Sequence, residues 1–420
     1  MPKSKKILLI TLPSEKKCRD WRAPDYYQTT KSARYMPLGL LSLATNLSRS
    51  HDVEILDASA KDLTIEQTIS EIETRSPDIL GISSLTERAY AMREILQRTS
   101  VPYKAVGGPH MTYYTEQTLR QGADAVFVGH LADLEFNEAV ENLPKGIINC
   151  ETKIDQIKLP DRNFVDIDYY FPKKFVFFEA QNRLPMFSSI GCPHHCTFCD
   201  VQTKKIQRKS PEKVVEEMKY LHSLGSRSIH VLDDNFNVNE PHVHRIMNEM
   251  GKQRFSCEWS GRGQARMSED LAARLSEYYF KRIHVGFEAL DDQMLRFFRK
   301  PQNTEQIARF CNTMNKHKID MLGFFIVGTP VETEEYLRRF PKQIKELNIK
   351  YPYVQILYPA PNTEYYSQLL KQGIYKKDIW KEFMENPIPD FVIPYPYEKT
   401  KLEFLLSYVD DLEKQFMLQK

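Results

Sequence analysis

The most restrictive feature of this chain is a C-x3-C-x2-C run formed by Cys192, Cys196 and Cys199. A cuboidal iron-sulfur cluster normally takes one thiolate on each iron, so a loop with three cysteines leaves one iron open to another ligand. The apolar run 185–190 precedes this loop, and Pro211 follows it in the first turn of an expected helix, where proline is favoured. The run therefore predicts a strand, a cluster loop and a helix.

A structural zinc site is the competing interpretation, because His194 and His195 add nitrogen ligands to the three thiols. Zinc sites usually pair two short cysteine or histidine knuckles, and no second knuckle lies nearby. The other cysteines are scattered singly along the chain, at Cys18, Cys150, Cys257 and Cys311. The spacing therefore favours the iron-sulfur cluster.

Length and composition indicate a multidomain cytoplasmic protein. A chain of 420 residues is long enough for two or three domains. The net charge of +2 gives no basic excess for a nucleic-acid partner. No apolar run approaches the ~20 residues of a membrane-spanning helix. Seven cysteines without paired spacings fit a reducing compartment.

The first part of the chain alternates apolar, strand-like runs with helical patterns, which predicts an α/β fold with a parallel sheet covered on both faces. Such a doubly wound, Rossmann-like domain binds ligands beyond the carboxyl ends of its strands. Strands are expected at 7–12, 53–56, 79–83, 103–106 and 125–128, and helices at 38–48, 64–74, 89–97 and 116–121.

The cysteine run, with Phe198 before its last cysteine, resembles the signature of the radical S-adenosylmethionine (SAM) superfamily. This resemblance implies that the methionine part of SAM chelates the open iron, and that an electron from the cluster cleaves SAM to a 5′-deoxyadenosyl radical. Further strands alternate with helices and predict a partial TIM-type (β/α)6 barrel. These strands are expected at 187–190, 228–232, 256–260, 283–287, 321–327 and 353–358.

The resemblance assigns polar residues after the second barrel strand to the amino group of SAM. Asp234 is expected to be the closest contact, with Asp233 and Asn235 beside it, because a carboxylate suits an ammonium. For any one of these residues alone, an ordinary ion pair is the competing interpretation.

Later barrel strands supply two further expected SAM contacts. Arg266 would pair with the methionine carboxylate or a nearby acid, and Arg262 is a competing choice. Glu288, in a Gly-x-Glu stretch, would accept hydrogen bonds from the ribose hydroxyls or hold Arg266. At the end of the barrel, Asn362 stands where relatives usually have glycine, which is tolerable if its backbone is left-handed.

The N-terminal segments 37–44, 51–57, 77–83 and 106–112 resemble the cobalamin-binding domain that is fused to one class of radical SAM enzymes. The resemblance implies that Ser83 and Leu85 line the pocket of the corrin's nucleotide tail. Gly107 and Gly108 would allow close approach of the backbone to the bulky ligand. A Rossmann-like domain that no longer binds a corrin is the alternative.

One departure concerns the lower face of the cobalt. The loop after Leu12 contains no histidine, and the first histidine in the chain is His51. The cobalt would therefore lack a histidine ligand from this loop, and the loop 13–34 is expected to cover its lower face. His130, where many relatives carry glutamate, is assigned no role.

These observations divide the chain into a cobalamin-binding domain at 1–145, a linker at 146–184, a radical SAM barrel at 185–365 and a small, mostly helical extension at 366–420. The extension includes an expected helix at 401–418. In related enzymes a segment at this place completes the substrate pocket.

The resemblance implies a cobalamin-dependent radical SAM enzyme that methylates an unactivated carbon of a small molecule or natural-product intermediate. Its cofactors would be a 4Fe-4S cluster, SAM and cobalamin, and a flavodoxin- or ferredoxin-type protein would supply single electrons. The alternatives are a cyclase, rearrangement or oxidation enzyme with the same cofactors, a radical SAM enzyme whose first domain lost the corrin, and a non-catalytic corrinoid carrier. A methylthiotransferase is disfavoured, because that group of enzymes needs a second cysteine triad in its N-terminal domain, and here only Cys18 precedes the linker.

Overall fold

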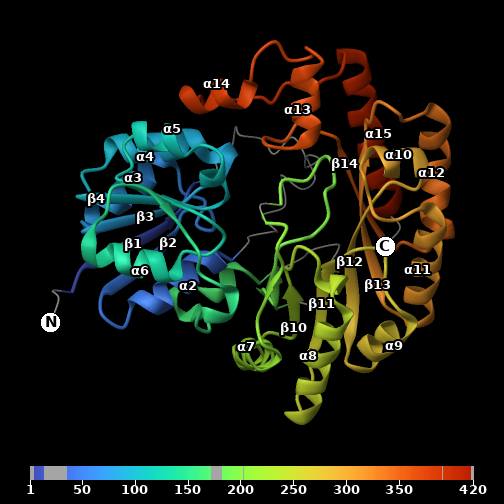
Figure 1. Cartoon of the computed structure of the whole chain (residues 1–420), viewed down its shortest axis with the longest axis horizontal. Coiled ribbons are helices and arrows are strands. Elements are labelled where there is room, and N and C mark those ends of the chain that lie inside the picture. Colours follow the sequence, from blue (N-terminus) through green and yellow to red (C-terminus); the bar gives the residue numbers. More distant parts are fainter. Residues whose placement is uncertain (1–3, 14–35, 172–181, 202, 390, 418–420) are drawn as a thin grey trace. The chain divides into compact units, whose positions relative to one another are not determined.

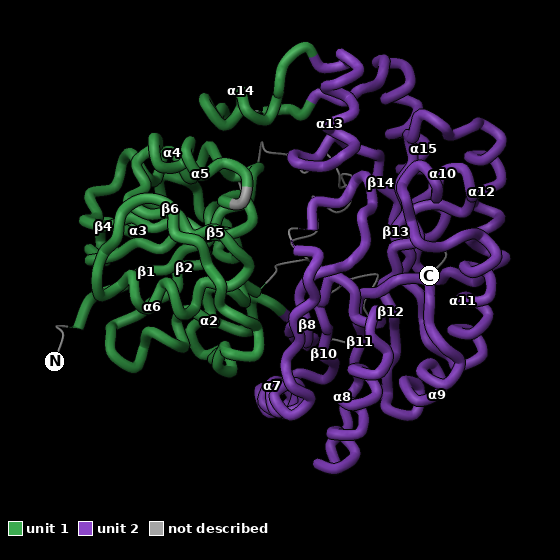
Figure 2. Tube along the Cα trace, viewed as in Figure 1, with its two compact units in different colours: residues 1–20, 33–170, 376–393 green, residues 21–32, 171–375, 394–420 purple. Residues whose placement is uncertain are grey.

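The computed structural model describes residues 4–13, 36–171, 182–201, 203–389 and 391–417. The chain forms two units (Figure 2). The first takes its described residues from 1–20, 33–170 and 376–393, and the second from 21–32, 171–375 and 394–420. None of the described helices is long and apolar enough to cross a membrane.

The first unit is built on a six-stranded sheet in the order β2-β1-β3-β4-β5-β6, and all its strand pairs are parallel (Figure 1). This is the doubly wound order, in which the chain reverses direction across the sheet between β1 and β3. The strands are β1 (Lys6–Thr11), β2 (Asp52–Asp57), β3 (Ile79–Ser83), β4 (Tyr103–Gly107), β5 (Ala125–Val128) and β6 (Gly146–Asn149). The helices are α2 (Leu38–Leu47), α3 (Ile65–Arg75), α4 (Ala89–Arg98), α5 (Thr115–Arg120) and α6 (Asp133–Asn142).

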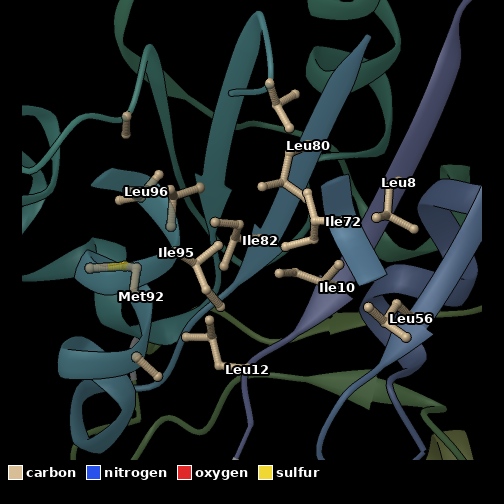
Figure 3. Packing of buried hydrophobic residues seen from close by; sticks show 14 of the residues in the cluster. Leu8, Ile10, Leu12, Leu56, Ile72, Leu80, Ile82, Met92, Ile95 and Leu96 are labelled. Atoms are coloured by element: carbon tan, nitrogen blue, oxygen red, sulfur yellow. The ribbon is translucent and has the colours of Figure 1, made fainter. Parts of the chain in front are cut away.

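Both faces of this sheet are buried, as the continuous apolar strands predict. Alternate residues of β1 point to opposite faces: Leu8 and Ile10 belong to one hydrophobic cluster (Figure 3), and Ile7 and Leu9 to another. The sheet is therefore held from both sides, and its carboxyl edge is left for loops.

The first unit differs from the sequence expectation at its last strand. The linker was predicted to begin at residue 146, but Gly146–Asn149 pairs with β5 as the sixth strand. This strand lies at the sheet edge with alternately exposed residues, so it lacks the buried apolar run that reveals a central strand.

The second unit contains a six-stranded parallel sheet in the order β14-β13-β12-β11-β10-β7. Its strands are β7 (Arg183–Met186), β10 (Ser228–Val231), β11 (Glu258–Gly263), β12 (Phe280–Glu288), β13 (Asp320–Val327) and β14 (Tyr351–Ile356). Its helices are α7 (Pro211–Ser223), α8 (Glu240–Lys252), α9 (Glu269–Glu277), α10 (Asp292–Phe297), α11 (Thr304–Lys316), α12 (Glu334–Glu346), α13 (Glu364–Lys371) and α15 (Lys399–Met417). The sequential strand order is that of the predicted partial barrel.

The first barrel strand was predicted four residues too late, at 187–190. The strand that pairs with β10 is Arg183–Met186, whereas β8 (Ser189–Ile190) pairs antiparallel with β9 (Gln207–Arg208). The apolar run thus contains the end of β7 and all of β8, and β8 leads into the cysteine loop.

The residues of the predicted C-terminal extension divide between the two units. Helix α14 (Ile379–Glu385) belongs to the first unit, whereas α13 and α15 belong to the second. In the first unit, Gln121 donates a hydrogen bond of 2.8 Å to the carbonyl of Met384, and Arg120 forms an ion pair of 2.8 Å with Glu385. Helix α14 is therefore attached to the end of α5.

Candidate active site

The cysteine loop begins at a residue that must be glycine. Gly191 has a φ of +91°, and a Cβ there would lie 2.5 Å from the carbonyl oxygen of Lys205. The next residue, Cys192, donates its backbone N–H to the carbonyl of Thr203 at 3.0 Å. The start of the loop is thus held against residues that follow it, as a cluster loop requires.

The middle of the loop is anchored to the barrel by backbone hydrogen bonds. The N–H of Thr197 donates to the carbonyl of Phe298 at 3.1 Å, and its carbonyl accepts from the N–H of Tyr365 at 2.8 Å. Phe198 packs edge-on against Phe298, with 5.1 Å between ring centroids. The aromatic residue of the signature therefore packs against the protein and helps to fix the loop.

The three thiols are partly buried, and the basic groups of Lys300 and Lys204 lie near Cys196. Burial raises the pKa of Cys196 and raises that of Cys199 to about 12, and the charge of Lys300 lowers the pKa of Cys196 part of the way. Within the described residues, no three His, Cys, Asp or Glu side chains are placed to share one metal ion. The three cysteines that hold a cuboidal cluster need not converge on one metal ion, because each binds a different iron.

Asp233 supports the loop instead of facing a ligand. Its fully buried carboxylate accepts hydrogen bonds from the backbone N–H groups of Ser188 (2.7 Å) and Ser189 (2.9 Å), and from both hydroxyls. Burial raises the pKa of Asp233, and these hydrogen bonds lower it. Asp234 is exposed and accepts from the N–H of Gly191 at 2.7 Å, so its carboxylate keeps capacity for a further donor.

Asn235 lies between the cluster loop and β11. Its side-chain nitrogen is 3.8 Å from the sulfur of Cys192 and 3.4 Å from Oε1 of Gln264. Its buried Oδ1 has no hydrogen-bond partner among the described residues. The ring of His194 also meets Gln264 Oε1, at 2.7 Å. A buried acceptor of this kind suits the ammonium of an amino acid.

Glu288 ends β12 and pairs with Lys300. Lys300 Nζ lies 3.3 Å from Glu288 Oε1, and each side chain is only 10% exposed. Glu288 has a φ of +65°, which is unusual for a residue other than glycine. A Cβ at Gly286 would lie 2.5 Å from Glu288 Oε1, which explains the glycine of the Gly-x-Glu stretch. Arg266 does not hold Glu288: its side chain is exposed.

Sequence reasoning missed Gln264 and Lys300. Gln264 directly follows β11, so its place at a strand end was an available signal. Lys300 follows helix α10, twelve residues after the end of β12, and no local pattern indicated it. Asn362 has a left-handed backbone, with a φ of +57°, which is the condition under which asparagine was expected to be tolerated in place of glycine.

In the first unit, the loops after β3 and β4 are joined at the carboxyl edge of the sheet. Gly108 has a φ of +99°, and a Cβ there would lie 2.7 Å from the carbonyl oxygen of Ser84 and 3.3 Å from Ser83 Oγ. A Cβ at Gly107 would meet only ordinary contacts. The Gly108 conformation is therefore required by the neighbouring loop, and Leu85 is left 43% exposed beside it.

The same edge carries a buried carboxylate that the sequence did not single out. Asp57, at the end of β2, accepts a hydrogen bond of 2.6 Å from Thr11 and another from the hydroxyl of Tyr170. These contacts fix the ends of β1 and β2. The loop 13–34, expected to cover the lower face of the cobalt, lies outside the described residues apart from Pro13.

Comparison with known proteins identifies both units. Residues 186–344 match the Radical SAM superfamily, and residues 30–135 match the B12 binding domain. The chain therefore belongs to the B12-binding radical SAM enzymes, whose cofactors are a 4Fe-4S cluster, SAM and cobalamin.

Its relatives include methyltransferases. The chain is 28% identical over 379 residues to an uncharacterized methyltransferase of Pyrococcus horikoshii, covering 83% of this chain and 81% of the relative. It is 25% identical over 346 residues to the bacteriochlorophyllide d C-12(1)-methyltransferase of Chlorobaculum tepidum, covering 80% and 74%. The structure of the radical SAM methyltransferase TsrM from Kitasatospora setae, with tryptophan substrate and a SAM analog bound, has the same fold, with a TM-score of 0.70, 17% identity and 87% and 76% coverage. The chain is thus a B12-binding radical SAM enzyme that is similar to methyltransferases.

Proposed function

We propose that this enzyme methylates an unactivated carbon of a small molecule by a radical mechanism. The observation that carries the proposal is the set of polar groups around the cysteine loop, which provides separate partners for the parts of SAM. Cys192, Cys196 and Cys199 would hold the 4Fe-4S cluster, which supplies the electron that cleaves SAM.

The ammonium, the carboxylate and the ribose of SAM each have a proposed partner near the cluster loop. Asn235 Oδ1 and the exposed carboxylate of Asp234 would accept hydrogen bonds from the ammonium. Lys300 provides a cation for the methionine carboxylate in place of Arg266, and Glu288 beside it would accept from the ribose hydroxyls. Asp233 would act indirectly, by holding Ser188 and Ser189 before the loop.

Cobalamin would bind at the carboxyl edge of the sheet in the first unit. Leu85 offers exposed apolar surface next to Ser83, and the Gly108 conformation fixes the loop beside them. We propose the segments 1–145 and 185–365 as the cobalamin-binding and radical-forming domains, with the modification that β6 extends the first of them.

The proposed reaction consumes two molecules of SAM per product. One donates its methyl group and leaves as S-adenosylhomocysteine. The other is cleaved reductively to methionine and 5′-deoxyadenosine, which carries the hydrogen removed from the substrate carbon. Two electrons per turnover are needed, and a flavodoxin- or ferredoxin-type protein would supply them.

Isotope-labelled SAM tests the proposal. Anaerobically purified, reconstituted enzyme would be incubated with reductant, trideuteromethyl-SAM and small-molecule extract, and the products would be separated by mass. We expect a product in which a trideuteromethyl group replaces hydrogen, with equal amounts of S-adenosylhomocysteine and 5′-deoxyadenosine. Substrate-dependent 5′-deoxyadenosine without a labelled product would instead support a cyclase, rearrangement or oxidation.

A further inference from the structure

The sheet of the second unit carries a polar layer on one face of β10, β11 and β12. His230 is in register with Ser260, and Arg262 with His284. Because alternate residues of a strand share a face, Arg262 shares its face with Ser260. The two histidines lie 4.4 Å apart between ring centroids, and His230 Nδ1 is 2.7 Å from Ser260 Oγ. These side chains therefore form one layer across neighbouring strands.

The two histidines of this layer do not contribute positive charge. Each is only 4% exposed. Burial lowers the pKa of both rings well below its usual value, and the charges of Arg183, Arg262 and Arg282 lower it further. Both rings are therefore neutral near pH 7, and the arginines provide the charge of the layer.

Arg262 differs from Arg282, another arginine of this layer, in its ion pairs. Arg282 forms an ion pair of 3.4 Å with Asp320 and lies 4.1 Å above the ring of Tyr351. Arg262 is half-buried. Its buried Nε has no hydrogen-bond partner, and no acidic residue in the described part of the chain pairs with it.

An unmatched guanidinium at this position is costly. Arginine keeps its charge at all physiological pH values, and a partly desolvated charge without a counterion is unfavourable. The neutral histidines in the same layer do not compensate the charge of Arg262. A ligand with negative charge would do so.

The layer lies deeper in the barrel than the residues proposed to contact SAM. His284 precedes Glu288, a proposed SAM contact, by four residues on β12, and Arg262 lies one residue before the end of β11, in register with His284. Two residues of a strand span about 6.6 Å. A group bound at Arg262 would therefore hold the rest of a small molecule toward the strand ends, where SAM is cleaved.

We propose that Arg262, with His230 and His284 beside it, binds an anionic oxygen group of the substrate, either a carboxylate or a phosphate. The guanidinium would hold two of its oxygens in a bidentate arrangement. The role of this anchor in catalysis rests on the proposed function, but anion binding itself does not.

Isothermal titration calorimetry of reconstituted, SAM-loaded enzyme without reductant would test this proposal. The probes are phenylacetate, phenyl phosphate and the neutral phenylacetamide. We expect at least one anion to bind ten times more tightly than the amide. Arg262→Gln should weaken anion binding at least tenfold, and Arg262→Lys should weaken it less. The matched control is Arg309→Gln, because Arg309 is 65% exposed on α11 and its one ion pair among the described residues is with Glu305.

Cluster absorbance and SAM affinity of each variant separate the outcomes. Unchanged values in Arg262→Gln, together with lost anion affinity, support the proposal, and the preferred probe distinguishes carboxylate from phosphate. Equal binding of anions and amide to the unmodified enzyme would overturn it, even if a variant fails to fold. Parallel loss of SAM affinity would also overturn it, because Arg262 would then be a SAM ligand. Absence of 5′-deoxyadenosine from reduced, unmodified enzyme would count against the proposed function alone.

Discussion

At the scale of single residues, the two basic groups offered for the SAM carboxylate can be distinguished by substitution. Lys300→Gln should weaken SAM binding at least tenfold, because a charge-assisted hydrogen bond contributes about 1.5–3 kcal/mol. Arg266→Gln should change it less than threefold, since the Arg266 side chain is exposed. Equilibrium binding of SAM to the reconstituted cluster measures both.

Replacing Lys300 also leaves the buried Glu288 without its partner, so a control is needed. The double variant Lys300→Gln/Glu288→Gln removes both charges and should keep the cluster spectrum. The opposite ranking, with Arg266→Gln more harmful in proteins that retain the cluster, would restore the assignment made from sequence.

The paired glycines of the first unit allow a second test at this scale. Gly108→Ala should destabilise the unit by about 1–3 kcal/mol, because a Cβ would strain the positive φ and clash with the carbonyl of Ser84. Gly107→Ala should be nearly neutral for stability, because its Cβ would lie 3.8 Å from Phe127. Chemical denaturation measures the difference, and equal effects would show that Gly108 is not constrained.

The sequence selects candidate site residues where they belong to a motif. It does not reveal which side chains a residue contacts in the folded protein. The cysteine run and Glu288 lie in motifs of fixed spacing, so the sequence alone selects them, and their roles stay a prediction. Ser188 and Ser189, the partners of Asp233, lie 45 and 44 positions before it in the sequence. Lys300, the partner of Glu288, lies 12 positions after it. No local pattern specifies such contacts. For this reason Asp233 was assigned to SAM, whereas the structure satisfies it with Ser188 and Ser189.

At the scale of elements, α15 illustrates how a buried charge makes stability depend on pH. The helix packs on β14, its residues Leu405, Val409 and Leu412 are buried, and Glu413 is buried next to Leu412. Burial raises the pKa of Glu413 to about 8, and Asp410 adds to the rise. Because the folded state favours the protonated acid, stability is fullest below the ordinary pKa near 4.5 and falls as pH rises toward 8.

Glu413→Gln removes this pH-dependent cost. We expect the variant to be more stable than the parent at pH 9, by about 2 kcal/mol, and the two to converge near pH 4. Thermal unfolding across this pH range is the measurement. A constant difference at all pH values would show that Glu413 is solvated in the folded protein.

Elements with strong periodicity were predicted within a few residues, including α2, α4 and α15. The edge strand β6 was not predicted, and the first barrel strand was placed four residues too late. The run 185–190 holds the end of β7 and all of β8, which pair with different partners. Hydrophobicity cannot separate two strands that follow each other directly in one apolar run.

At the scale of the whole molecule, each cofactor is assigned to a different unit. Replacing Cys192, Cys196 and Cys199 together by alanine should therefore remove the iron and abolish SAM cleavage, while cobalt content stays near that of the parent. Iron and cobalt analysis of anaerobically purified protein measures this. Loss of cobalt together with iron, in protein with unchanged circular dichroism, would refute the assignment of one cofactor to each unit.

Helix α14 limits how this protein can be divided into fragments. The chain enters the second unit after residue 170, returns to supply residues 376–393 to the first, and leaves again for α15. No single continuous segment therefore encodes either unit. A fragment ending at residue 170 would expose the surface of α5 that Met384 and Glu385 contact. If the chain were cut just after residue 171, the contacts of α14 with α5 would still hold the two fragments together.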